Sequence, residues 1–493
     1  MKSAPSSLAL LIDFYELTMA YGYWKSGRAS DEAVFTLSFR TLPFGGGYAV
    51  ACGLASVIEH LQSFRFSGED IEYLEGLRGN ADAPLFERAF LEFLAGFSLS
   101  VDVDAVPEGT VVFPNEPLVR VQGPLVQAQL LETMLLTLIN FNTLIASKAA
   151  RVCQAARGDH VIEFGLRRAQ GSDGGLSASR AAYVGGCQGT SNTLAGKRFG
   201  IPVRGTHAHS WVMAFEDERD AFDAYARTLP SDCILLVDTY GTLSGIRRAI
   251  ETGHKLRQMG HDLLGIRLDS GDLAWLSQQA RRMLDEAGFA KTFIIASNDL
   301  DEYRIQSLKE QGAAIDVWGV GTRLVTGYGD AALNGTYKLT AVHKPGQPWR
   351  RVLKITNQLA KISTPGILQV RRFASGGEFL GDCIYDTVSG GGPKPTIIDP
   401  LDQTRRKHFA PGTSFEDLLV PIMRGGRLVY AMPDLERIRA HVRLQLAGLH
   451  AAIKRLDNPH EYPVGLEPSL YRLKTDLVLR ARGLGGEQGE APK

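Results

Sequence analysis

Six apolar runs between residues 160 and 321 constrain the fold more than any other feature of this chain. Each run ends in polar or glycine residues and precedes a stretch with helical periodicity, which is typical of a parallel sheet covered by helices. The runs are residues 160–165, 201–206, 234–239, 263–269, 293–298 and 315–321. We predict an irregular or incomplete parallel α/β barrel, or a doubly wound sheet, with functional groups at the carboxyl ends of the strands.

The segments on either side of these runs predict a second, α+β domain. A helix is expected to begin at Asp13, and short strands are expected over 33–39 and 101–126. Further predicted elements are a long helix over 127–152, strands from 335 to 372 and a basic amphipathic helix over 435–456. We therefore expect an N-terminal α+β domain (1–152), a catalytic barrel (153–330) and a C-terminal segment (331–493) that completes the first domain. The tail from about residue 483 is predicted to be disordered.

Composition excludes several classes of partner. Lys plus Arg and Asp plus Glu both number 54, so no net field attracts nucleic acid or an anionic membrane. The five cysteines are scattered and form no CxxC pair, which favours a reducing compartment over a disulfide framework or a zinc site. The sequence shows neither a signal peptide nor an apolar run near the roughly 20 residues of a membrane helix. We therefore expect a cytoplasmic protein.

The end of the first run favours an anion site. Arg167 and Arg168 follow Phe164, and guanidinium groups bind carboxylate or phosphate through paired hydrogen bonds, with an aromatic ring available for stacking. A surface salt bridge is the simpler explanation of either arginine alone. The Gly- and Ser-rich passage 171–189 is predicted to form loops whose amides, with those of the following helix starts, bind phosphate.

The second run leads into Thr206-His-Ala-His-Ser210. Two histidines could be a metal pair, but no third ligand of matching type stands nearby. A nucleophilic or acid–base imidazole is the more plausible use, because neutral histidine titrates near physiological pH. A hydrogen-bonded structural histidine remains the alternative.

Later runs also end in chemically useful groups. Arg267 and Asp269 close the fourth run, where an aspartate beside phosphates could hold magnesium or sugar hydroxyls. Helix capping is the simpler role for Ser270 and Asp272, and for residues 297–302. Gly319, Gly321 and Thr322 close the sixth run, where barrels often bind phosphate through loop amides.

Taken together, these motifs resemble the nicotinate phosphoribosyltransferase family. The matching stretches are Glu163-Phe-Gly-Leu-Arg-Arg-Ala-Gln170, Gly205-Thr-His-Ala-His-Ser210, Arg267-Leu-Asp-Ser-Gly-Asp272, Gly319-Val-Gly-Thr322, Asp13-Phe-Tyr15-Glu-Leu-Thr-Met, Pro43-Phe-Gly-Gly-Gly and Tyr337-Lys-Leu. They occur in order and extend over nearly the whole chain.

The resemblance implies a reaction in which nicotinate displaces diphosphate from 5-phosphoribosyl 1-diphosphate and gives nicotinate mononucleotide for NAD synthesis. ATP hydrolysis would drive it through a phosphorylated His209, with Mg²⁺ as cofactor. The chain would be a homodimer with a shared active site, with Tyr15 donated across the interface. The implied substrate contacts are Tyr15 and Thr206 for nicotinate, Phe164 and Arg167 as ring plate and anion clamp, Ser210 within the histidine motif, Arg267, Gly319, Gly321 and Thr322 for phosphoribosyl diphosphate, and Asp269 for ribose or magnesium.

Two departures from related enzymes bear on the substrate. Asn192 stands where nicotinamide-using relatives carry an aspartate, and a neutral side chain there favours a carboxylate substrate. The paired acids of nucleobase-salvage transferases are absent. The alternatives are a nicotinamide or quinolinate phosphoribosyltransferase, or a catalytically silent member that binds nucleotide. A Schiff-base aldolase needs a lysine at a strand end, and none of the six runs ends in one.

Overall fold

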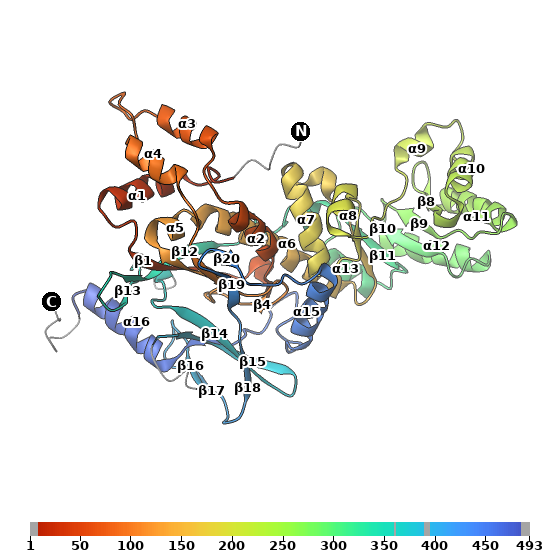
Figure 1. Ribbon diagram of the computed structural model, residues 1–493. Coiled ribbons are helices and arrows are strands. Elements are labelled where there is room, and N and C mark those ends of the chain that lie inside the picture. The colour runs from red at the N-terminus through yellow and green to blue at the C-terminus, as the bar shows by residue number, and fades with distance from the viewer. Residues whose placement is uncertain (1–7, 359–360, 389–394, 485–493) are drawn as a thin grey trace. The chain divides into compact units, whose positions relative to one another are not determined.

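The computed structural model describes residues 8–358, 361–388 and 395–484 (Figure 1). The predicted disordered tail therefore lies almost entirely outside the described residues. The chain forms two compact units: unit 1 contains Met1–Thr143 and Leu333–Lys493, and unit 2 contains Leu144–Ala332.

Unit 2 is built on a six-stranded sheet in the order β7-β6-β11-β10-β9-β8, in which every pair is parallel. Consecutive residues of the central strands are buried, as expected when helices cover both faces. β7 and β8 are the two edges, so the barrel is incomplete. The strands are β6 (His160–Glu163), β7 (Gly189–Thr190), β8 (Ile234–Leu236), β9 (Gly265–Leu268), β10 (Phe293–Ala296) and β11 (Val317–Val320).

Helices follow the strands directly, and several begin at a side-chain cap. Asp272 and Asp301 accept hydrogen bonds from the first-turn amides of α12 and α13, which stabilises a helix start just beyond the strand. The elements between the strands are η2 (Leu166–Arg168), α7 (Gly171–Gly185), α8 (Thr193–Phe199), α9 (His209–Met213), α10 (Glu218–Thr228), η3 (Pro230–Asp232), α11 (Thr242–Gln258), α12 (Leu273–Glu286), α13 (Glu302–Glu310) and α14 (Thr322–Val325).

Two predictions for this unit are wrong in detail. The run 201–206 forms only one bridge, between Val203 and Thr190, because Pro202 has no amide proton to donate to a ladder. The Gly- and Ser-rich passage is mostly helix α7 rather than a loop. Two of its glycines allow close packing, since a Cβ on Gly175 would lie 2.7 Å from the Leu166 side chain and one on Gly185 would lie 2.3 Å from the carbonyl oxygen of Ala146.

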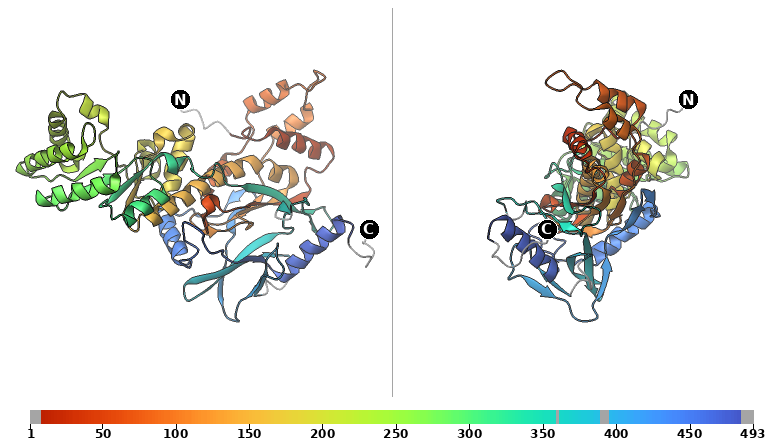
Figure 2. Two further views of the ribbon diagram at one scale, coloured as in Figure 1. Left: turned by 180° about the vertical axis from the view of Figure 1, so that it is seen from behind. Right: turned by 60° about the vertical axis from the view of Figure 1, so that its left-hand side comes forward.

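Unit 1 combines segments from both ends of the chain. Its first sheet has the order β13-β12-β1-β5-β3-β19-β20, and β12 pairs antiparallel with β1 (Figures 1 and 2). The C-terminal segment thus completes an N-terminal sheet, giving the expected additional α+β domain. The strands are β1 (Glu32–Phe39), β3 (Asp102–Ala105), β5 (Val119–Pro124), β12 (Gly335–His343), β13 (Arg350–Arg351), β19 (Val420–Arg424) and β20 (Arg427–Leu428).

A second sheet in unit 1 has the order β17-β16-β21-β15-β14-β18. Its strands are β14 (Leu368–Ser375), β15 (Glu378–Asp386), β16 (Thr396–Ile398), β17 (Arg406–His408), β18 (Ser414–Asp417) and β21 (Val464–Leu466), and a small pair joins β2 (Ala49–Val50) to β4 (Val111–Val112). The helices are α1 (Phe14–Lys25), η1 (Pro43–Gly45), α2 (Leu54–Ser63), α3 (Gly68–Gly76), α4 (Arg88–Ala95), α5 (Leu125–Gln129), the first half of α6 (Glu132–Ala155), α15 (Leu435–Ala447) and α16 (Pro468–Ala481). The second half of α6, from Leu144, belongs to unit 2.

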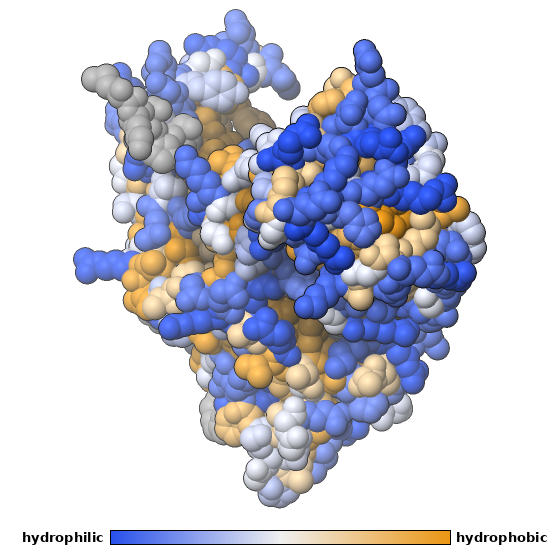
Figure 3. Space-filling model, turned by 90° about the vertical axis from the view of Figure 1, so that its right-hand side faces the viewer, coloured by the Kyte–Doolittle hydropathy of each residue, from blue (hydrophilic) through white to orange (hydrophobic). Residues whose placement is uncertain are grey.

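Two helices of this list differ from expectation or need comment. The predicted helix 435–456 ends at Ala447, and Gly448 follows it, where an added Cβ would lie 2.7 Å from the ring of Phe379. The stretch Leu125–Ala155, which contains α5 and α6, is the one described helical stretch long and apolar enough to cross a membrane, yet 61% of its most apolar window is buried, as in a core helix. Hydrophilic residues prevail on the face shown in Figure 3, with apolar residues interspersed.

Candidate functional site

The carboxyl ends of β8, β9 and β10, which are neighbours in the sheet of unit 2, bring together side chains from distant parts of the chain. Arg267 lies on β9 and Ser297 follows β10, while His209 begins α9. The hydrogen bonds described below join these three residues to Thr239 and Asp269. His209 and Arg267 therefore lie in one cluster at the carboxyl ends of the strands, where functional groups were expected.

Arg267 is held on three sides by polar partners. Its Nε donates to the Ser297 hydroxyl (2.9 Å), one terminal nitrogen donates to the Thr206 hydroxyl (3.1 Å) and the other to Asp269 Oδ1 (2.8 Å). Its guanidinium carbon also lies 5.7 Å from the centroid of the Phe164 ring. The direction of this cation is therefore set before any ligand binds.

Asp269 connects the arginine to His209. Burial alone would raise the pKa of the Asp269 carboxyl, but the Arg267 charge and hydrogen bonds from Ser297 and Arg267 outweigh burial and lower that pKa. The second oxygen, Oδ2, lies 3.7 Å from Nε2 of His209, and the other ring nitrogen, Nδ1, lies 3.2 Å from the Thr239 hydroxyl. The ring is 40% exposed, so His209 is both oriented and accessible.

His207 has a different role from His209. Its Nε2 accepts a hydrogen bond from the Leu236 amide (3.1 Å), so Nδ1 carries the proton and donates to the Ala208 carbonyl (3.3 Å). Burial lowers the pKa of His207 to about 4, which keeps the ring neutral near pH 7. His207 therefore supports the edge strand β8. Within the described ranges no three His, Cys, Asp or Glu side chains gather as a metal-ligand group.

A buried carboxylate fixes the turn that carries Phe164. Glu163 is fully buried and accepts hydrogen bonds from the Gly165 amide, the Ser179 hydroxyl (2.9 Å) and the Thr190 hydroxyl (2.5 Å). The Phe164 ring then packs on Gly319, where an added Cβ would lie 2.7 Å from it. Gly319 is thus required for ring packing, in addition to any role of its amide.

Other residues that the sequence predicts for the site also lie at the carboxyl ends of the strands, but they are not part of the cluster of Arg267, Asp269 and His209. Thr322 begins α14 directly after Gly321, and Arg167 and Ser210 are exposed on η2 and α9. Their predicted substrate contacts remain predictions. Tyr15 belongs to unit 1, where it lies on α1 and is 44% exposed.

Asn192 is a buried helix cap. Its carbonyl oxygen accepts from the amides of Leu194 (3.1 Å) and Ala195 (3.2 Å), and its amide nitrogen donates to the Ser179 hydroxyl (3.1 Å). This capping role was not predicted from the sequence. Its effect on substrate choice stays a prediction.

Three further residues of the site were missed in the sequence. Helix capping was expected for residues 297–302, and Asp301 caps α13 as expected, but Ser297 contacts both Arg267 and Asp269 instead. Asp238 and Thr239 end the third apolar run, and Asp238 hydrogen-bonds the Asp269 amide while Thr239 contacts His209. Their position at a strand end was the available signal.

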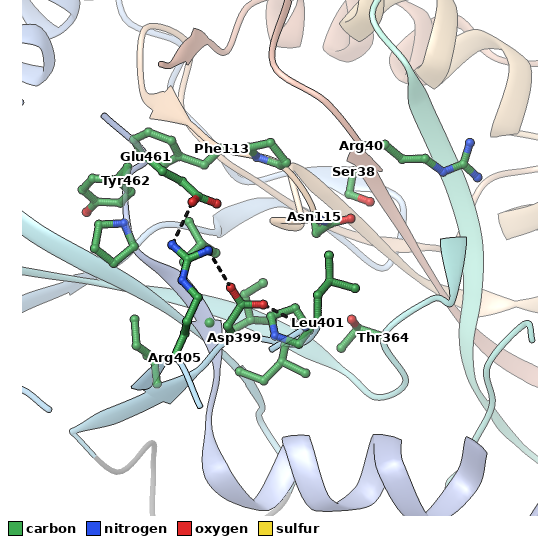
Figure 4. Close-up of a pocket in the computed structure, with 18 of the residues that line it drawn as sticks. Ser38, Arg40, Phe113, Asn115, Thr364, Asp399, Leu401, Arg405, Glu461 and Tyr462 are labelled. Atoms are coloured by element: carbon green, nitrogen blue, oxygen red, sulfur yellow. Dashed lines mark hydrogen bonds and ion pairs between the residues drawn. The ribbon is translucent and has the colours of Figure 1, made fainter. Parts of the chain in front are cut away.

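Unit 1 contains a separate cavity of about 690 Å³. One wall is the face of β1 and β12 that carries Thr36, Ser38, Arg40, Thr336, Lys338 and Thr340. In the close-up of Figure 4, Ser38 and Arg40 lie on one side, and Arg405 lies opposite, between Glu461 (2.8 Å) and Asp399 (3.5 Å).

The lining of this cavity is strongly cationic. Seven Lys or Arg residues and only two acids line it: Arg40, Lys338, Lys361, Arg405, Arg406, Lys407 and Lys474 against Asp399 and Glu461. Burial lowers the pKa of Lys474 to about 8 and also lowers the pKa of Lys338. Cations that are costly to bury, next to a row of hydroxyls, are suited to bind an anion with several oxygens.

Models of one protein family match the three parts of the chain. Residues 10–140 match the nicotinate phosphoribosyltransferase N-terminal domain, residues 160–363 match the nicotinate phosphoribosyltransferase family, and residues 369–474 match the C-terminal domain. The chain belongs to the nicotinate phosphoribosyltransferase family. The Arg267, Asp269 and His209 cluster lies within residues 160–363, the part of the chain that matches the family model.

Individual family members are similar over nearly their whole length. A nicotinate phosphoribosyltransferase of Bacillus subtilis is 43% identical, covering 96% of this chain and 95% of its own. One of Mycobacterium tuberculosis is 42% identical over 93% and 91% of the two chains. The crystal structure of human nicotinic acid phosphoribosyltransferase matches with a TM-score of 0.82 and 32% identity, covering 94% of this chain and 99% of that one.

Proposed function

We propose that the protein makes nicotinate mononucleotide and diphosphate from nicotinate and 5-phosphoribosyl 1-diphosphate, a step of NAD biosynthesis, and that it couples this step to ATP hydrolysis through a phosphohistidine at His209. Family membership supports the transferase reaction. The observation that carries the coupling is the placement of an exposed, oriented imidazole 3.7 Å from Asp269, which in turn holds Arg267.

Arg267 has the central role in substrate binding. Departure of diphosphate builds positive character on the ribosyl carbon and negative charge on the leaving oxygens, so a cation fixed in direction stabilises the transition state. The guanidinium is held by Thr206, Ser297 and Asp269 before substrate binds, which lowers the reorganisation needed. Phe164, 5.7 Å away, offers a ring face for the pyridine.

Asp269 is the residue of this cluster that would hold Mg²⁺. Its half-buried carboxyl has a lowered pKa and is therefore charged at neutral pH, and Mg²⁺ is commonly bound by one or two carboxylates together with substrate phosphates. When bound, the metal would neutralise charge on the departing diphosphate.

His209 would receive the phosphoryl group of ATP. An imidazole nitrogen attacks the γ-phosphorus, the bond to the ADP oxygen breaks, and water later removes the phosphoryl group as phosphate. Coupling requires that the phosphorylated and free states differ in substrate affinity. Because Asp269 lies between His209 and Arg267, a change of charge on His209 affects Arg267 through their shared partner Asp269.

His209→Ala tests this assignment. We expect the variant to lose stimulation by ATP while retaining some ATP-independent turnover, measured as diphosphate release with nicotinate in the presence and absence of ATP. Acid-labile phosphate on the protein should disappear. His261→Ala is the matched control, because His261 precedes β9, away from the carboxyl ends of the strands, and contacts Ser231. Full ATP stimulation in His209→Ala would refute the phosphohistidine.

Incubation of the purified protein with nicotinate, nicotinamide or quinolinate and phosphoribosyl diphosphate separates the substrate alternatives. A silent nucleotide-binding member would turn over none of the three. We expect nicotinate to be preferred, with Asn192 avoiding repulsion of its carboxylate.

We also propose a cytoplasmic homodimer that shares its active site, with Tyr15 contributed by the second copy. The support is the surface of α1 and its preceding turn, where Leu11, Phe14 and Tyr15 are 52%, 54% and 44% exposed. Exposed apolar side chains grouped in this way are typical of association surfaces. Sedimentation velocity tests the dimer, and a monomer at micromolar concentration would contradict it.

Finally, we propose that the cationic wall of the unit 1 cavity binds phosphate groups of ATP or phosphoribosyl diphosphate. Arg40 and Lys338 lie there beside the hydroxyls of Ser38, Thr336 and Thr340. Charged and hydroxyl donors on one sheet face match the oxygens of a polyphosphate.

A further inference from the structure

Asp238 joins the end of β8 to the loop that carries Asp269. Its Oδ2 accepts hydrogen bonds from the Asp269 amide (2.8 Å) and from the Ser270 hydroxyl (2.7 Å). The next residue, Thr239, contacts Nδ1 of His209 at 3.2 Å. Two consecutive residues at one strand end therefore hold both partners of the His209–Asp269 pair.

The loop that Asp238 anchors is a tight connection between β9 and α12. Asp272 caps α12 by accepting from the Trp275 amide (3.1 Å), and Gly271 has a φ of +79°, a left-handed conformation that favours glycine. Only Asp269 and Ser270 lie between β9 and this glycine. The direction of the Asp269 side chain, and through it the contacts to Arg267 and His209, thus depends on how these two residues are held.

The second carboxylate oxygen of Asp238 indicates that this residue has a role beyond stabilising the loop. Oδ1 is buried and has no hydrogen-bond partner among the described residues. A buried acceptor without a donor destabilises a fold, and such groups concentrate where function sets the geometry. A residue that only closed the loop could use one oxygen, as a serine or asparagine does.

We propose that Asp238 is a positioning residue for ATP coupling: it holds the backbone of Asp269 so that the Asp269 carboxylate faces Arg267 and His209 together. This inference rests on the proposed phosphohistidine function. Asp238 acts through the Asp269 amide and the Ser270 hydroxyl, and Thr239 sets the His209 ring from the same strand end.

Substitutions that separate shape from charge test the proposal. Asp238→Asn keeps an oxygen able to accept from Asp269 and Ser270 but removes the charge, whereas Asp238→Ala removes the acceptor. We expect Asp238→Ala to lower ATP-stimulated kcat on the order of 100-fold, as a displaced catalytic group does, with little change in KM for nicotinate. Phosphohistidine formed per subunit should fall in parallel. The ATP-stimulated kcat of Asp238→Asn should stay within about threefold of wild type, because the asparagine oxygen can hold the Asp269 backbone in the same position.

Asp262→Ala is the matched control, because Asp262 precedes β9, away from the carboxyl ends of the strands, and pairs with Arg257 at 2.7 Å. It should resemble wild type. Wild-type-like stimulation in a folded Asp238→Ala would overturn the proposal, as would a loss in Asp238→Asn equal to that in Asp238→Ala. If Asp238→Ala does not fold, Asp238→Ser takes its place, because its shorter side chain cannot reach the Asp269 amide in the same way, and it should show the same loss of ATP-stimulated kcat and of phosphohistidine. Absence of ATP stimulation in the wild type would instead refute the proposed function.

Discussion

The strand-end site of unit 2 and the cavity of unit 1 both present cations, but they do so in different ways. In unit 2 a single arginine, Arg267, is fixed by three hydrogen-bond partners. In unit 1 seven cations surround about 690 Å³, and burial lowers the pKa of two of them, Lys338 and Lys474. The fixed arginine can stabilise negative charge that develops in one direction. The buried lysines of the cavity lose solvation of their charge, and a bound anion would offset that cost.

The largest expected effect is in the strand-end site of unit 2. Arg267→Met should lower kcat/KM for phosphoribosyl diphosphate by about 100-fold or more, because it removes an oriented cation and leaves Asp269 without its main partner. Steady-state diphosphate release measures this. Arg219→Met removes an exposed salt bridge to Glu251 elsewhere in unit 2 and should change the rate little. Equal losses in the two variants would remove the distinction between the strand-end site and an ordinary surface charge.

An intermediate effect is expected in the cavity. Lys338→Met should weaken binding of the phosphate-bearing substrate about tenfold, since a hydrogen bond to a charged group contributes about 1.5–3 kcal/mol. Calorimetric titration with ATP and with phosphoribosyl diphosphate measures it and shows which of the two the cavity holds. Lys407→Met is the control, because Lys407 donates to the Leu380 carbonyl at 2.6 Å. If neither titration changes in Lys338→Met, the cavity has no role in phosphate binding.

The smallest effect concerns the support of the strand-end site and depends on pH. His207 has a pKa lowered from 6.5 to about 4, so its contribution to stability is present above pH 6.5 and is lost as pH falls toward 4. The loss is at most about 3 kcal/mol. His207→Gln, which keeps an acceptor for the Leu236 amide, should flatten the fall in thermal midpoint between pH 6.5 and 4. The same change at His209 is the matched control for losing a histidine, and parallel curves for wild type and His207→Gln would contradict the assignment.

The difference between local sequence patterns and contacts of distant segments explains what the sequence could predict. Five of the six apolar runs are strands of the parallel sheet, because each buries its residues on both faces and carries that signal locally. Arg267, Asp269 and His209 stood out because each lies beside other polar groups in a short motif. The run 201–206 was also predicted as a strand, but it forms only one bridge, because Pro202 lacks the amide proton that strand pairing requires.

The rest depends on neighbours that are distant in sequence. Asp238, Thr239 and Ser297 gain their roles from the order β10-β9-β8, which no single run reveals. The cavity is lined by residues from strands more than 300 positions apart, such as Thr36 and Thr340, so no motif marks it. Gly185 of α7 resembled a loop residue in the sequence, because the neighbour that requires a glycine there, Ala146, lies in another segment.

The pairing of β1 with β12 has a consequence for how the chain is made. Thr36 and Thr340 are 304 positions apart, so the first strand emerges from the ribosome long before its neighbour exists. Domains generally fold as units during synthesis, and distant pairings form slowly. Residues 144–332 can therefore be synthesised while one edge of β1 is still unpaired. If translation stops before residue 335, the released chain lacks β12, and this edge of β1 remains unpaired.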